Sequence, residues 1–144
     1  MVNIQHNFMV NAPVVRVYEA ITTLDGLRRW WTKETTGNPD KDGEIRFGFG
    51  EEFYNKMKVS ALTKDASVAW DCTDGPPDWL GTQIIFTLSE QKNGCSVKFE
   101  HKGWKEANDF YGMCNYHWGL YMKSLKLLCE TGKGTPHIAD VKAM

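Results

Sequence analysis

The chain has 144 residues, 17 basic and 18 acidic, with a formal charge of −1. This length fits one domain that buries about two-thirds of its unfolded surface, enough for a sizeable core and an internal pocket. The charges are mixed and form no basic block, which argues against a nucleic-acid partner. No apolar run has the length of a membrane span and the first residues do not form a signal peptide, so we expect a cytosolic protein.

The first elements predicted are one strand and two short helices. Hydrophobic alternation predicts a strand over residues 4–10. Asn11 is the expected N-cap of a helix that runs to about Thr22, and a further turn or two of helix is predicted over residues 24–31. The polar, glycine-containing segment 35–43 is predicted to be a loop.

Alternation with a period of two predicts five further strands. They cover residues 44–49, 53–62, 67–72, 82–89 and 95–102. In the last of these, Cys95, Val97, Phe99 and His101 alternate with polar residues, which is typical of a half-exposed antiparallel strand. The sheet therefore has one apolar face that another element must cover.

A long helix predicted over residues 105–131 supplies that cover. At about 100° per residue, one of its faces is mainly apolar and aromatic. This face collects Phe110, Cys114, His117, Tyr121, Leu125 and Leu128. His117 lies near its centre, so we expect it to point inward together with His101. A curved antiparallel six-stranded sheet packed on this helix is an α+β fold, and it can enclose a cavity.

The same order of elements contains motifs that together resemble a known family. They are Phe8–Thr22, Leu27 with Trp30-Trp31, His101-Lys-Gly-Trp104, and the end of the long helix from Trp118 to Gly132. With these the chain resembles the START-like (SRPBCC) superfamily, which has the helix-grip fold. More narrowly, it resembles the family named for the activator of the Hsp90 ATPase. We therefore expect a START-like domain over residues 1–132 and a C-terminal tail over 133–144.

The resemblance implies a cavity between sheet and helix that binds lipids, hormones, polyketides or other apolar molecules, and some relatives are cyclases or aromatases. The predicted cavity residues are the following: Trp30, Phe47, Phe49, Met57, Trp70, Trp79, Phe86, Phe99, His101, Trp104, Cys114, His117 and Tyr121. The competing interpretation is a filled aromatic core. Trp79, in a Gly-Pro-Pro-Asp-Trp loop, either covers the cavity mouth or fastens the loop to the sheet.

Histidine chemistry has two interpretations. A histidine in an apolar pocket is suited to general acid–base catalysis. The alternative is that His101 and His117 are core histidines that hydrogen-bond to backbone carbonyls. We favour this alternative over catalysis, but still expect both to line the pocket.

Other site chemistry is not expected. Residues 131–135 superficially resemble a phosphate-binding loop, but they follow a helix, and Gly132 fits the helix C-cap. No histidine lies at metal-ligand spacing from another ligand, and no nucleophile motif is present. The four cysteines lack C-x-x-C spacing and are expected to be reduced, buried thiols. We therefore expect neither cofactor nor metal.

The leading functional hypothesis is non-enzymatic binding of a small, lipid- or polyketide-like molecule. The second is an interaction module that modulates an Hsp90-type chaperone, and the third is a cyclase- or hydrolase-like enzyme that uses His101 or His117. A homodimer is also considered. An enclosed cavity would favour the first or third hypothesis. A filled core with an exposed apolar patch would favour the second.

Overall fold

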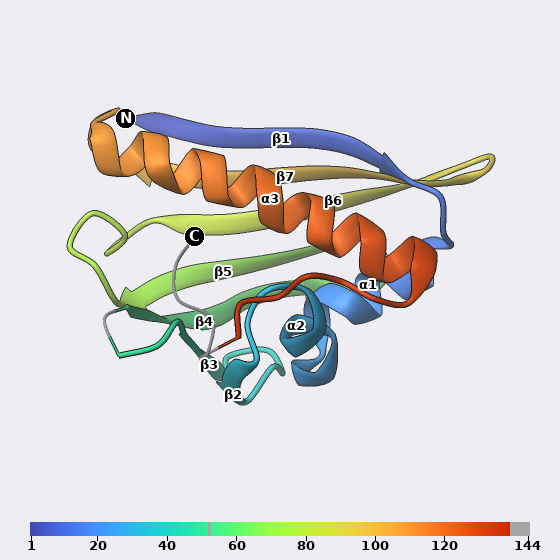
Figure 1. The fold of residues 1–144 in the computed structure, drawn as a ribbon, viewed down its shortest axis with the longest axis horizontal. Helices are drawn as coiled ribbons and strands as arrows, with labels where there is room; N and C mark the ends of the chain where they lie inside the picture. Colours follow the sequence, from blue (N-terminus) through green and yellow to red (C-terminus); the bar gives the residue numbers. More distant parts are fainter. Residues whose placement is uncertain (52, 139–144) are drawn as a thin grey trace.

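The computed structural model describes residues 1–51 and 53–138. Figure 1 shows a curved sheet with one long helix across its face and two short helices near one end. Along the chain the elements are β1 (Val2–Val10), α1 (Val14–Thr22), α2 (Leu24–Trp30), β2 (Glu34–Gly37), β3 (Glu44–Gly48), β4 (Tyr54–Thr63), β5 (Ser67–Asp74), β6 (Gln83–Gln91), β7 (Gly94–Trp104) and α3 (Asp109–Thr131). The α+β class and the sheet-plus-helix arrangement are confirmed.

The sheet has seven antiparallel strands in the order β1-β7-β6-β5-β4-β3-β2. Six strands were predicted, and the additional one is β2. It includes residues 35–37, so the prediction of a loop over 35–43 is wrong for its first three residues. This edge strand pairs Thr35 with Phe47 and Gly37 with Ile45. Thr35 is its one buried residue, so the strand shows no apolar alternation that could reveal it in the sequence.

The start of α1 differs from the prediction. Its N-cap is Pro13, which offers no side-chain hydrogen bond, so the assignment of Asn11 as N-cap is wrong. The backbone N–H of Asn11 instead donates to Glu130 Oε2 at 2.7 Å, which ties the end of β1 to α3. α2 has a regular cap, because the Thr23 hydroxyl accepts from the Gly26 N–H.

Both ends of α3 are set by their caps. Asn108 Oδ1 accepts from the Tyr111 N–H at 2.9 Å, so the helix begins at Asp109, later than predicted. Gly132 adopts φ 87° and its N–H donates to the Leu128 carbonyl, which confirms the predicted C-cap.

The inward face of α3 is rotated from the predicted one. Trp118 is 2% exposed and occupies the central inward position, whereas His117 is half-exposed on the flank. The expectation that His117 points to the interior is therefore wrong. The buried residues Cys114 and Leu125 were on the predicted face, but Trp118 and Met122 are buried beside them in place of His117 and Tyr121. A helical wheel does not show which of two adjoining apolar rows is central.

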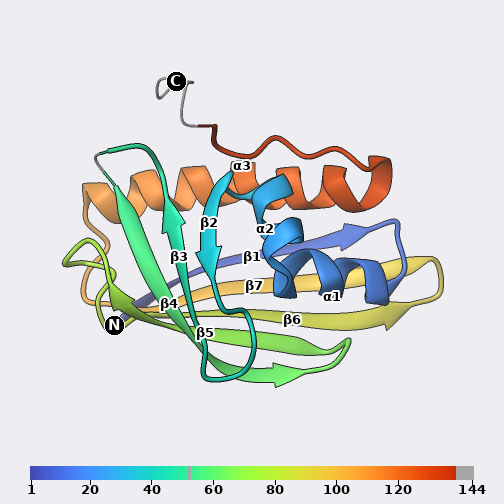
Figure 2. The same ribbon diagram turned by 90° about the horizontal axis from the view of Figure 1, so that it is seen from below.

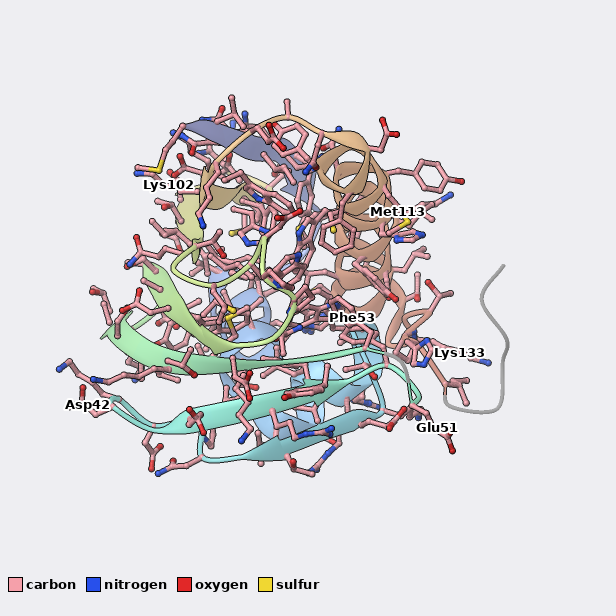
Figure 3. All side chains as sticks on the ribbon, turned by 90° about the vertical axis from the view of Figure 1, so that its left-hand side faces the viewer. Asp42, Glu51, Phe53, Lys102, Met113 and Lys133 are labelled. Atoms are coloured by element: carbon pink, nitrogen blue, oxygen red, sulfur yellow. The ribbon has the colours of Figure 1, made fainter. Side chains whose placement is uncertain are left out.

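Aromatic rings fill much of the space between sheet and helices. Ring centroids are 4.2 Å apart for Trp31 and Phe47, 4.5 Å for Phe99 and Trp118, and 4.9 Å for Trp31 and Trp118. Figure 3 shows Phe53 in this region between sheet and helix. α2, β3, β7 and α3 thus meet in one aromatic core.

After α3 the chain turns back toward α2 (Figure 2). Ser124 Oγ donates to the Trp30 carbonyl at 2.7 Å and accepts from the Thr135 N–H at 2.7 Å. His137 forms a parallel bridge with Thr32. The domain itself therefore holds this part of the expected tail, and residues 139–144 lie outside the described part.

Candidate functional site

The candidate site is a buried polar chain at one end of the core. Trp118 Nε1 donates to His101 Nδ1 at 3.1 Å, so His101 Nδ1 is an acceptor. His101 Nε2 lies 2.8 Å from Thr82 Oγ1, and the Thr82 hydroxyl donates to the Trp79 carbonyl at 2.6 Å. Since Thr82 has a single proton to give, His101 Nε2 must carry the hydrogen. The chain of bonds therefore fixes a neutral Nε2–H imidazole.

This geometry bears on the role of His101. Burial lowers its pKa to about 3, and both ring nitrogens already have partners. A neutral, fully hydrogen-bonded imidazole is poorly placed to exchange protons at neutral pH. The arrangement fits the interpretation as a core histidine, except that its partners are side chains and not backbone carbonyls.

Trp79 covers this polar chain from the loop between β5 and β6. Its side chain is 4% exposed, and its ring centroid lies 4.6 Å from His101 and 5.6 Å from Phe53. The backbone N–H of Trp79 donates to the Pro76 carbonyl at 2.9 Å. The ring therefore fastens the loop to the core and closes this end of the interior.

Several buried polar atoms at this end have no hydrogen-bond partner among the described residues. They are Nε1 of Trp79, Nε1 of Trp104, and both Oδ1 and Nδ2 of Asn55. The Cys114 thiol adjoins the Trp79 indole, but a thiol is a weak acceptor and the two do not form a standard hydrogen bond. Burial raises the pKa of Cys114 to about 11, so the thiol stays protonated.

The predicted cavity residues fall into three groups. Those buried in the continuous core are Trp30, Phe47, Met57, Trp70, Trp79, Phe86, Phe99, His101, Trp104 and Cys114. Phe49 and Tyr121 are partly buried and pack against this core. His117 is half-exposed, and its ring lies 5.7 Å from that of Tyr116.

The described surface has open hollows, including the following two. One, of about 520 Å³, is an open groove between α1, α2 and the end of α3, lined by residues that include Arg16, Arg29 and Leu128. The other lies beside the β6–β7 turn. None of the predicted cavity residues lines either hollow.

Four members of the site were not among the predicted cavity residues: Phe53, Asn55, Thr82 and Trp118. Asn55 is a polar residue on the apolar face of its strand, which was a usable signal. Thr82 precedes β6 and is in phase with the buried Ile84 and Phe86, but this phase alone did not indicate its hydrogen bond to His101. Trp118 could have been found from its spacing of four residues to both Cys114 and Met122.

The outer face of α3 carries an apolar row, here named the outer stripe. Met113, Tyr116 and Leu120 are 49%, 66% and 49% exposed and follow one another at spacings of three and four residues. Figure 3 shows Met113 on the side of α3 away from the sheet. The stripe is thus separate from the buried cluster.

Within residues 1–51 and 53–138, no three His, Cys, Asp or Glu side chains are grouped to hold a metal ion. No helix in the same ranges is both long enough and apolar enough to cross a bilayer.

The family model described as "Activator of Hsp90 ATPase homolog 1-like protein" matches residues 11–130. The chain belongs to this family. It is part of the START-like (SRPBCC) superfamily, as the sequence motifs predicted. Among curated protein sequences, no relative matches the chain.

Solved structures agree with this family. The solution structure of the Aha1 dimer from Colwellia psychrerythraea is 37% identical, covers 93% of this chain and 100% of its own, and has a TM-score of 0.85. MLL2253 from Mesorhizobium loti is 16% identical, with coverage of 88% and 96% and a TM-score of 0.76. SSP2350 from Staphylococcus saprophyticus is also 16% identical, with coverage of 96% and 99% and a TM-score of 0.77. The last two likenesses concern the fold alone.

Proposed function

We propose that this member of the Hsp90 ATPase activator family is an interaction module that binds an Hsp90-type chaperone and modulates its ATPase. The outer stripe on α3 is the observation that carries this proposal. The family's description supplies the chaperone as the partner.

The stripe has the form of a docking surface. Met113, Tyr116 and Leu120 align on one face of a long helix, so they present adjoining apolar area to solvent. Exposed Asn115 and Lys123 lie beside them on the helix and provide a polar rim. Exposed tyrosine and methionine are residue types enriched at protein interfaces.

Chaperone binding tests the proposal. We expect the wild-type chain to change the ATPase rate of a purified Hsp90-type chaperone, and Met113→Glu with Leu120→Glu to weaken binding at least tenfold. Val15→Glu is the matched control, because Val15 is 45% exposed but lies on α1. A wild-type chain without binding or ATPase effect would refute the proposal, and so would a stripe variant that binds like wild type.

Self-association is a separate proposal for this chain, prompted by the dimer described for the Colwellia relative. Light scattering over a range of concentrations measures it. If the stripe variant abolished a wild-type dimer without changing chaperone binding, the stripe would be the dimer contact and the chaperone assignment to it would be wrong.

Binding of a small apolar molecule is the second candidate function. One observation favours it: the predicted residues Trp79, His101, Trp104 and Cys114 do gather at one end of the core, and two of their indole N–H groups have no acceptor among the described residues.

A further inference from the structure

We propose that the Trp79 indole occupies a ligand site, and that a planar, neutral and mainly apolar molecule with a carbonyl oxygen displaces it beneath the β5–β6 loop. The inference rests on the second candidate function and names the chemistry of the ligand. It is independent of the outer stripe.

The walls of the site suit a flat bicyclic molecule. The Trp79 ring has Phe53 at 5.6 Å, Trp118 at 6.1 Å and Trp104 at 6.4 Å between centroids. The Trp118 ring is nearly parallel to it, at 23°, whereas the Trp104 ring meets it edge-on at 70°. A ligand with the size and flatness of an indole can take over these contacts.

The unpaired polar atoms define what such a ligand must carry. Trp104 is 1% exposed, and its N–H can only donate. Leaving a buried polar group unpaired costs about 1–3 kcal/mol, so a native structure retains such groups for a reason. An acceptor oxygen on the ligand would satisfy Trp104. Asn55 adjoins Gly75 at the start of the loop, and its amide, unpaired among the described residues, is a further candidate partner for a ligand.

The charges around the site favour a neutral oxygen. Burial lowers the pKa of His101 to about 3 and raises the pKa of Cys114 to about 11, so both stay uncharged. The other members of the site are Trp79, Thr82, Asn55, Trp104, Trp118 and Phe53, which carry no charge. A buried carboxylate would need a counter-charge that this cluster does not supply, whereas a ketone or amide carbonyl needs none.

The loop that carries Trp79 has glycines where it must bend. Gly75 and Gly81 adopt φ 143° and 81°, and no atom lies within 4 Å of a Cβ placed on Gly81. The Gly81 N–H donates to the Cys72 carbonyl at a long 3.3 Å. When the loop moves outward, the Trp79 indole N–H can donate a hydrogen bond to water. This new bond offsets part of the free energy needed to open the loop.

Three naphthalene probes test the inference on the full chain. They are 1-acetonaphthone, which carries a neutral carbonyl, 1-ethylnaphthalene, which has no acceptor, and 1-naphthoate, which is charged. With 15N-labelled protein we expect 1-acetonaphthone to bind at least tenfold more tightly than the other two. It should also shift the Trp104 indole N–H resonance. Trp79→Ala should tighten its binding at least tenfold because the site is then vacant.

Trp104→Phe should remove the preference for the carbonyl probe. The matched control is Trp30→Phe, which deletes an indole N–H that already donates to the Ala20 carbonyl at 2.8 Å. This variant should keep the preference. If Trp104→Phe does not fold, the shift of the Trp104 resonance in wild type still decides the matter.

Each alternative outcome is informative. Lack of binding of all three probes to both wild type and Trp79→Ala would overturn the inference and the second candidate function together. Binding that leaves the Trp104 resonance and the carbonyl preference unaffected would overturn the inference alone. If 1-naphthoate bound most tightly of the three, the inference that the ligand carries a neutral carbonyl would be wrong.

Discussion

Trp118 on α3 and His101 on β7 are joined by a hydrogen bond of 3.1 Å between Nε1 and Nδ1. This bond connects the long helix to β7, next to the β1 edge of the sheet, and through Thr82 the connection continues to the loop of Trp79. One neutral imidazole therefore links three separate parts of the fold. The three parts can pack in this way only while the His101 imidazole is neutral.

Acidification should destabilise the protein through His101. Its pKa is near 6.5 in an unfolded chain and about 3 in the fold, because burial disfavours the charged ring. Between these pH values the unfolded chain binds more protons than the folded one. The contribution of His101 to the unfolding free energy is therefore fully present above pH 6.5 and is lost as the pH falls toward 3. The full difference is roughly 5 kcal/mol. Urea unfolding between pH 7 and 4 should show a loss of roughly 3 kcal/mol of this.

His101→Gln is the matched variant for this effect, because glutamine does not titrate in this range. Its unfolding free energy should fall less steeply between pH 6.5 and 4 than that of wild type. NMR of the wild-type ring should show the neutral Nε2–H tautomer at pH 5. A His101 ring that titrates near 6.5 in the folded protein would contradict this prediction.

Trp118→Phe should lower the free energy of unfolding by more than the smaller ring alone would explain. It leaves His101 Nδ1 buried without a donor, which costs about 1–3 kcal/mol in addition to the lost packing. Trp104→Phe removes a similar volume from a buried ring whose N–H has no partner among the described residues. Urea unfolding should show the Trp118 variant to be less stable by that margin. Equal losses would show that the hydrogen bond contributes nothing.

The fold was largely predictable because its strands alternate cleanly and its long helix ends at a glycine. The exceptions have specific physical causes. β2 buries just Thr35, and its pairing comes from β3 and not from its own pattern. The orientation of α3 about its axis depends on how it packs against the sheet. This packing buries Trp118 and leaves His117 half-exposed.

The candidate site was predictable in part. His101 followed from the phase of its strand, because apolar periodicity marks an inward face. Trp118 was missed because the predicted helix phase favoured His117, and Trp79 lies in a loop where periodicity gives no guide. Thr82 was missed because its role depends on a hydrogen bond to His101, which is distant in sequence. A sequence pattern does not show which buried polar atoms find partners.

The native thiols should be unreactive. Cys72, Cys95, Cys114 and Cys129 are all buried. Burial raises the pKa of Cys72 and Cys114 to about 11 and that of Cys129 to about 12. At pH 8 a thiol with such a pKa is ionised in about one molecule in a thousand or fewer. We expect a disulfide reagent such as DTNB to label them slowly in buffer and rapidly in urea. Fast labelling in buffer would contradict burial.

Asn55→Leu should stabilise the fold. Asn55 is fully buried on the inner face of β4, and neither side-chain polar atom has a partner among the described residues. Leucine of similar size removes that desolvation cost, so the unfolding free energy should rise by about 1–3 kcal/mol. Thr82→Val is the opposite case, because the Thr82 hydroxyl bonds to both His101 and Trp79, and it should lower stability by a similar amount. Urea unfolding of the two variants gives the signs directly. If Asn55→Leu lost stability as Thr82→Val does, Asn55 would have a structural partner within the fold and its amide would not be available to a ligand.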